Sequence, residues 1–122
     1  MITNPIVLLA VQLCFATESN YGQNIRTSDG GRAVGAYQVW PSRVREINRI
    51  AGRRIWTLGD RENTQLSRAM CLLDLNHRFT LGTTNVIDLA SRWRNPKGDA
   101  PEWHLRKLRK ALHELSDHHK RR

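Results

Sequence analysis

Cysteine is scarce in this 122-residue chain, and no paired cysteine or histidine pattern typical of a metal site is present. We therefore expect no metal ion and no other cofactor. Cys14 and Cys71 each lie in apolar sequence, which predicts two free thiols in the core or, alternatively, a disulfide bond between helices. The apolar stretch at residues 6–16 is too short to span a bilayer and lacks preceding basic residues, so we also expect no signal peptide.

Acidic residues are few relative to basic ones, since 11 Asp and Glu face 20 Lys and Arg, for a net charge of +9. Such a surplus indicates an acidic polymer as partner, which could be nucleic acid, an anionic membrane or a cell wall. No helix-turn-helix or zinc-finger pattern occurs, so we expect no specific nucleic acid partner. The basic side of the last predicted helix is either a solvated face or a surface for an anionic wall polymer or membrane. Its residues are Arg106, Lys107, Arg109, Lys110 and His113.

Internal repeats, long linkers and low-complexity tracts are also lacking. The length suits a single core, so we expect one domain at residues 1–116 and a monomer. Residues 117–122 are predicted to form a charged, frayed tail.

The first helix is predicted at residues 4–17, with Asn4 as N-cap, Pro5 at its first position and Gln12 as its one polar interior residue. It is typical of a buried central helix. A short hairpin or irregular loop should follow at residues 23–39. Further helices are predicted at residues 41–52, 60–81, 85–93 and from residue 102. In the helix at 60–81, the apolar face is expected to comprise Leu66, Ala69, Met70, Leu73 and His77.

Glu18 is the most informative residue, because it ends the apolar first helix and precedes a Gly-rich turn. The partial negative charge of a helix C-terminus and the loss of water in apolar surroundings both predict a raised pKa for this carboxyl group. A glutamate of this kind suits general acid catalysis of glycosidic bond cleavage. Taken alone, however, a Glu at a helix end is more often a solvated surface residue.

Glu18 belongs to the first of two short sequence motifs that occur in a fixed order. Glu18-Ser19 is followed, after a polar loop, by Gly35-Ala36-Tyr37-Gln38 and then Pro41. This arrangement resembles the soluble lytic transglycosylase and goose-type lysozyme families, whose core motif is Glu-Ser, a short loop or hairpin, and Gly-Leu-Met-Gln followed by Pro. The resemblance covers about residues 9–50 well and the remainder loosely. It extends to small phage-encoded members, which share the Ala-Val-Gly-x-x-Gln and Trp-Pro run.

The resemblance implies an α+β, predominantly helical fold: a lysozyme-like single domain with a buried central helix and a short hairpin or loop beside the cleft. It also implies a peptidoglycan-cleaving muramidase, with Glu18 as general acid and then base. In a lytic transglycosylase no second carboxylate is required. In a goose-type lysozyme, Asp29 would orient the attacking water, although Asp-Gly-Gly is also ordinary turn chemistry.

The same resemblance suggests further residues that touch the glycan. Gln38 matches the family glutamine that hydrogen-bonds a sugar in the cleft. Ser19 would support the glutamate or contact substrate, unless it simply caps the turn. Tyr37 stands where the family has Met, and is either a core residue or a wall for a sugar ring.

A later block is less regular. Trp93 fits the aromatic position of a family Ala-x-x-Tyr-Asn-x-Gly block, although it could equally belong to the core. Arg94 replaces the expected Asn, which puts the hydrogen bond normally made there in doubt.

Three functions therefore remain in view. The first is a lytic transglycosylase, the second a hydrolytic lysozyme, and the third a non-catalytic basic protein that binds wall or nucleic acid on the same scaffold. With no signal peptide expected, the protein would belong to a phage virion or the host cytoplasm and would reach the wall by another route.

Overall fold

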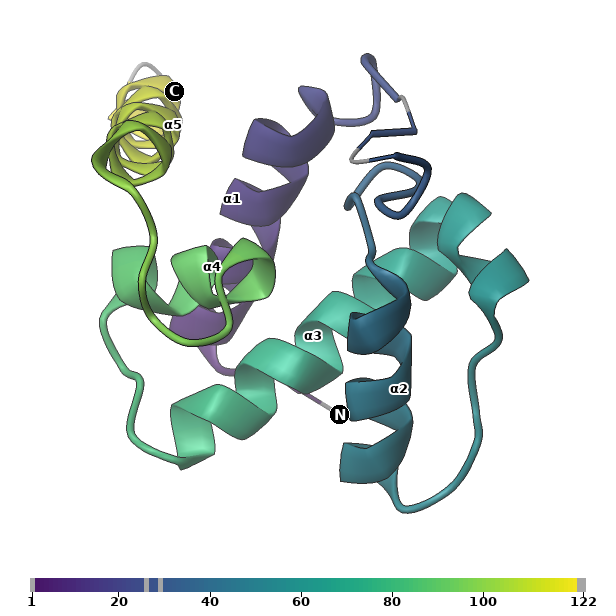
Figure 1. The fold of residues 1–122 in the computed structure, drawn as a ribbon. Coiled ribbons are helices and arrows are strands. Elements are labelled where there is room, and N and C mark those ends of the chain that lie inside the picture. The colour runs from purple at the N-terminus through teal and green to yellow at the C-terminus, as the bar shows by residue number, and fades with distance from the viewer. Residues whose placement is uncertain (1, 26, 29, 121–122) are drawn as a thin grey trace.

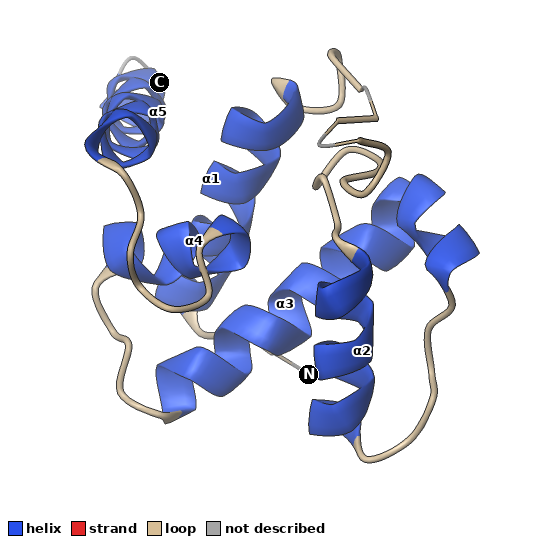
Figure 2. Cartoon of the chain, viewed as in Figure 1, coloured by secondary structure: helices blue, strands red, loops and turns tan. Residues whose placement is uncertain are grey.

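The computed structural model describes residues 2–25, 27–28 and 30–120, without the side chains of residues 118–120. Within these ranges the fold is predominantly helical, as expected (Figures 1 and 2). Five α-helices and one short 3-10 helix occur in the order α1 (Pro5–Ser19), α2 (Pro41–Ala51), η1 (Leu58–Glu62), α3 (Thr64–Thr80), α4 (Val86–Arg94) and α5 (Glu102–Lys120).

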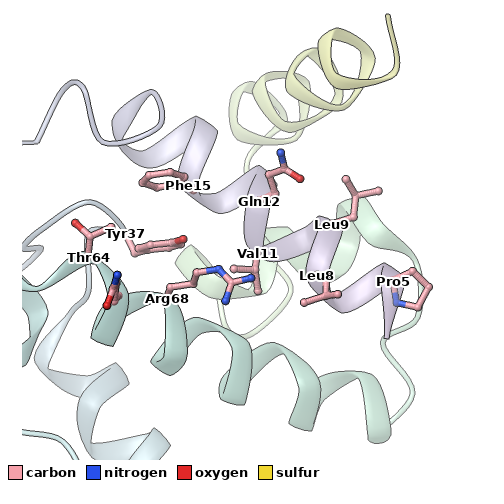
Figure 3. A pocket seen from close by; sticks show the side chains of 10 residues that line it. Pro5, Leu8, Leu9, Val11, Gln12, Phe15, Tyr37, Thr64 and Arg68 are labelled. Carbon is pink, nitrogen blue, oxygen red and sulfur yellow. The ribbon is translucent and has the colours of Figure 1, made fainter. Parts of the chain in front are cut away.

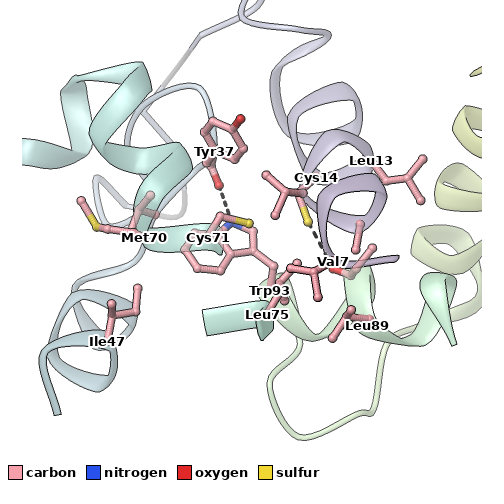
Figure 4. Packing of buried hydrophobic residues seen from close by; sticks show 14 of the residues in the cluster. Val7, Leu13, Cys14, Tyr37, Ile47, Met70, Cys71, Leu75, Leu89 and Trp93 are labelled. Atoms are coloured by element: carbon pink, nitrogen blue, oxygen red, sulfur yellow. Dashed lines mark hydrogen bonds between the residues drawn. The ribbon is translucent and has the colours of Figure 1, made fainter. Parts of the chain in front are cut away.

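Helix α1 packs against α3, α4 and α5 and so occupies the centre of the domain. Its N-terminus is capped as predicted, because the Asn4 side chain accepts hydrogen bonds from the backbone N–H groups of Ile6 and Val7. The helix ends at Ser19 with Asn20 as its C-cap. Asn20 has a left-handed conformation (φ 48°), and its backbone N–H donates to the carbonyl of Ala16. The core cluster around α1 contains Val7, Leu13, Leu75, Leu89 and Trp93 (Figure 4).

The β structure is smaller than the α+β prediction implies. In the described part of the loop between α1 and α2, the bridges Ser28–Ala33 and Val34–Val39 are isolated and no strand forms. A side chain supplies the missing support: Arg61 donates to the carbonyl oxygens of Arg32 (2.7 Å) and Val39 (3.1 Å). The loop is therefore held by the backbone hydrogen bonds of its two isolated bridges and by Arg61 of η1, without a continuous ladder.

The helix predicted at residues 60–81 begins later than expected. Residues 58–62 form η1, closed by a capping box in which the Asp60 carboxylate accepts from the N–H of Thr57 at 2.9 Å. Asn63 then caps α3 by accepting from the N–H of Leu66. Asp60 is thus a capping residue of the 3-10 turn and not of α3.

The buried face of α3 also differs from the predicted apolar stripe. Leu66 is 39% exposed, whereas Ser67 and Asp74 are fully buried. These polar side chains are tolerated because Ser67 donates to the carbonyl of Arg61 (2.9 Å) and Asp74 pairs with Arg78 (3.1 Å). A prediction based on the spacing of apolar residues alone therefore misses buried polar residues such as these.

Two further expectations concern the thiols and the tail. Cys14 and Cys71 are both buried and free, and Cys14 donates to the carbonyl of Ala90 at 3.4 Å (Figure 4). Burial raises the pKa of the Cys71 thiol well above its ordinary value, so it stays protonated. The tail predicted to fray from residue 117 is instead helical through Lys120.

His104, at the start of α5, predicts how stability depends on pH. Burial, and then the charges of Arg94 and Lys107, lower its pKa from 6.5 to about 4. Between these values the unfolded chain binds a proton that the folded chain does not, so the free energy of unfolding should fall as pH falls through this window, by at most about 3 kcal/mol. Urea unfolding at pH 7.5 and 4.5 measures this change. In His104→Phe the change should be smaller, and an equal change in both proteins would contradict the prediction.

Candidate active site

Glu18 lies one residue before the end of α1 and is buried, with 6% of its surface exposed. The turn that follows is unusually tight, because Asn20, Tyr21 and Gly22 all have positive φ. Just before this turn, the Glu18 carboxylate lies next to Arg94, the last residue of α4.

Ser19 maintains that turn. Its hydroxyl accepts from the N–H of Gly22 (2.9 Å) and donates to the carbonyl of Phe15 (3.3 Å), and the residue is 1% exposed. Both capacities of the hydroxyl are used locally, which corresponds to the turn-capping interpretation. Contact with a glycan would require this turn to open.

Arg94 is the cationic partner of Glu18. A guanidinium nitrogen of Arg94 lies 3.5 Å from a carboxylate oxygen of Glu18, and the same guanidinium stands 5.1 Å from the ring centre of Trp103. Arg94 is 36% exposed and Trp103 53% exposed. The pair therefore links the ends of α1 and α4 to α5, with its cationic side open to solvent.

Gln38 is held in a strained conformation. It is a non-glycine residue with a positive φ of 49°, and only 7% of its surface is exposed. Its amide nitrogen donates to the carbonyl of Gly35 (2.9 Å), and its amide oxygen accepts from the hydroxyl of Ser28 (2.6 Å). These bonds fix the amide within the loop between α1 and α2, where the resemblance predicts a sugar-binding side chain.

Tyr37 and Trp93 join this loop to α4. The Trp93 indole N–H donates to the backbone carbonyl of Tyr37 at 2.8 Å, and both residues are at most 3% exposed (Figure 4). The Tyr37 ring also stacks on Phe15, with 5.1 Å between ring centres. Both predicted substrate residues are thus core residues, and each also lines a cavity.

A cavity of about 240 Å³ lies beside Arg94 and gives the site its shape. Two indole side chains, Trp40 and Trp93, line it together with the guanidinium groups of Arg43 and Arg94. Ser42 and Pro96 complete the lining. Aromatic faces flanked by hydrogen-bond donors are suited to a sugar ring, which has apolar faces and polar edges. Glu18 does not line this cavity itself, but its ion-pair partner Arg94 does.

A buried acidic residue lies next to Arg43, which lines the cavity. Asp74 pairs with Arg78 (3.1 Å) and lies 3.9 Å from Arg43. Burial raises the pKa of Asp74 despite both cations. Arg78 also donates to the carbonyl of Pro96 (3.1 Å), so this network ties α2 and α3 to the segment after α4.

Three other sequence predictions concern a second acid, a metal ion and a membrane span. Asp29 lies outside the described residues. Among the residues described, His, Cys, Asp and Glu side chains form no group of three or more able to hold a metal ion. No helix in the described part of the chain combines the length and apolar character needed to cross a membrane.

Comparison of the chain with known proteins does not assign it. No family model, curated protein or solved structure matches it.

Several residues of the site carried no functional assignment from sequence. The pairing of Arg94 with Glu18 is the main one, since the sequence showed only that Arg replaces an expected Asn. Trp40 could have been found through the Trp-Pro run, which places an indole directly before α2. Nothing in the local sequence of Arg43 signalled its place in the cavity lining.

Proposed function

We propose that this protein is a peptidoglycan-cleaving muramidase, and specifically a lytic transglycosylase with Glu18 as general acid and base. The observation that carries the proposal is a buried glutamate at the end of an apolar helix, whose neighbour Arg94 lines a cavity together with two tryptophans. The motif blocks containing Glu18 and Gln38 support the same function. A lysozyme-like arrangement of the helices is part of this proposal.

The reaction follows from a single carboxyl group. Protonated Glu18 donates its proton to the leaving glycosidic oxygen, and an oxocarbenium-like centre develops on the muramoyl sugar. Ionised Glu18 then removes the proton of the muramoyl 6-hydroxyl, whose oxygen closes a 1,6-anhydro ring. Trp40, which is half-buried, would position a sugar ring, and Arg94 would stabilise the carboxylate while it is ionised.

Two alternatives depend on other features. A hydrolase would use Asp29 to orient water, which would leave reducing ends in place of anhydro ends. A binding protein without turnover is favoured by the Glu18–Arg94 ion pair, because a neighbouring cation keeps a carboxylate ionised and so opposes proton donation. For either of these functions, the exposed basic residues of α5 would supply attraction to anionic polymers.

Product analysis separates the three possibilities. Purified sacculi are incubated with the protein, and the released muropeptides are identified by mass spectrometry. Anhydromuramoyl ends support the transglycosylase, reducing ends identify a hydrolase, and sedimentation with the sacculi without release of fragments identifies a binding protein.

Replacing Arg94 with Asn, the residue that the resemblance leads one to expect, should alter the pH dependence of cleavage. Loss of a positive charge 3.5 Å from Glu18 favours the protonated carboxyl group. Because the acid must be protonated at the start, the fall in rate at high pH should move upward by roughly one pH unit. The measurement is the rate of wall lysis from pH 4 to 9.

Arg45→Asn is the matched control, since Arg45 is also an exposed arginine in a helix and lies outside the basic side of α5. Its profile should coincide with that of the wild type. Identical shifts in the two variants would show that only net charge matters, and no shift in Arg94→Asn would show that Arg94 does not set the protonation of Glu18.

A further inference from the structure

A second cavity, of about 500 Å³, lies between α1 and the first turns of α3 (Figure 3). It shares no lining residue with the cavity beside Arg94. The residues that α1 contributes to its lining are apolar except for Gln12: Pro5, Leu8, Leu9, Val11, Gln12 and Phe15. Its volume lies within the range of small-molecule sites, ~300–1,000 Å³.

The hydroxyl group of a largely buried tyrosine opens onto this cavity. Tyr37 is 2% exposed, and its hydroxyl makes no hydrogen bond within the described part of the chain. In Figure 3 the hydroxyl end of the ring points along the cavity on the side where Arg68 lies. Burial raises the pKa of Tyr37, so the hydroxyl is neutral and available as a donor.

Positive charge gathers at the same end. Arg68 reaches the cavity from α3 and forms no ion pair with any described residue. Thr64 and Gln65, in the first turn of α3, also line the cavity, and this turn contains no acidic residue. The partial positive charge of the helix N-terminus is therefore not offset within that turn. No acidic side chain lines the cavity among the residues that the structure describes.

We propose that this cavity binds an amphiphilic carboxylate, such as a medium-chain fatty acid. The carboxylate accepts a hydrogen bond from the Tyr37 hydroxyl and pairs with the Arg68 guanidinium, while the aliphatic chain lies along Leu8, Leu9 and Pro5. A single negative charge matches the one guanidinium group available. A dianionic phosphate would bring excess charge into a largely apolar site. This inference does not depend on peptidoglycan cleavage.

Calorimetric titration with decanoate and with decanol tests the proposal. The wild type should bind decanoate in a saturable manner, with chemical-shift changes at the methyl groups of Leu8 and Leu9. Arg68→Gln should weaken decanoate binding by about tenfold or more and leave decanol binding nearly unchanged. Tyr37→Phe, which keeps the ring, should weaken decanoate binding several-fold.

Arg53→Gln serves as the control, because Arg53 is an exposed arginine outside the cavity lining. Urea unfolding of each variant shows whether the fold is retained. Equal weakening by Arg53→Gln and Arg68→Gln would overturn the proposal, as would decanol binding that equals that of decanoate in the wild type. The proposal would also be overturned if the protein bound anionic vesicles but showed no saturable binding of decanoate. The lining of the cavity would then be a surface that contacts membranes.

Discussion

Glu18→Gln should reduce wall lysis by about a thousandfold while the protein remains folded. The amide keeps the size of the side chain but cannot donate a proton to the leaving oxygen. The loss of the ion pair with Arg94 should cost little stability, since the guanidinium is partly exposed to water. The measurements are the release of muropeptides from purified sacculi and the urea midpoint of both proteins.

Glu62→Gln is the matched control, because Glu62 is an exposed glutamate at the end of η1. It should lyse walls at the wild-type rate. If Glu18→Gln retains more than a small fraction of the wild-type rate, Glu18 is not the acid, and the proposed mechanism fails with it. Equal sedimentation of wild type and Glu18→Gln with sacculi would show that binding does not need the carboxyl group.

Gly35→Ala should cause the largest loss of stability among these single substitutions. Gly35 has φ 86°, and a Cβ atom there would lie 2.1 Å from the carbonyl oxygen of Arg61. That oxygen is fixed, because it accepts the Ser67 hydroxyl at 2.9 Å. Backbone strain and this contact together should lower the free energy of unfolding by about 3 kcal/mol or more.

Gly52→Ala separates the two causes. Gly52 has a similar φ of 78°, but apart from Gly52 and its two neighbours in the chain no atom lies within 4 Å of the position that a Cβ atom would take there. Only the backbone strain applies at Gly52, and we expect a loss of about 1 kcal/mol. Urea unfolding measures both values. Equal losses would mean that the loop moves away from η1 at no cost, and that the contact with Arg61 does not hold the loop.

The first helix and its catalytic candidate were predictable because their signals are local. Asn4 and Pro5 define the start of α1, an apolar run defines its length, and Glu18 follows from that position. The end of α2 at Gly52 was predictable for the same reason, since a glycine in the left-handed conformation ends many helices.

The face of α3 and the form of the loop were not predictable, because both depend on partners distant in sequence. Asp74 is buried because Arg43 of α2 and Arg78 surround it, and a count of apolar residues cannot register such a pair. The predicted hairpin is reduced to isolated bridges, and Arg61, more than 20 residues further along the chain, donates to the carbonyl groups of Arg32 and Val39. The position of Arg94 beside Glu18, 76 residues earlier in the chain, has no local signal either.

The hydrogen bond between Trp93 and Tyr37 spans 56 residues, and the contact between Cys14 and Ala90 spans 76. Neither can form until α4 has left the ribosome, so α1 emerges during synthesis with its apolar surface uncovered by its main partner. Closing such long loops is slow, and the nascent chain is exposed to aggregation during that interval. Within this domain the helix that carries Glu18 is synthesised before α3, α4 and α5, the helices that bury it, so a chaperone that holds apolar segments would be expected to raise the yield of folded protein.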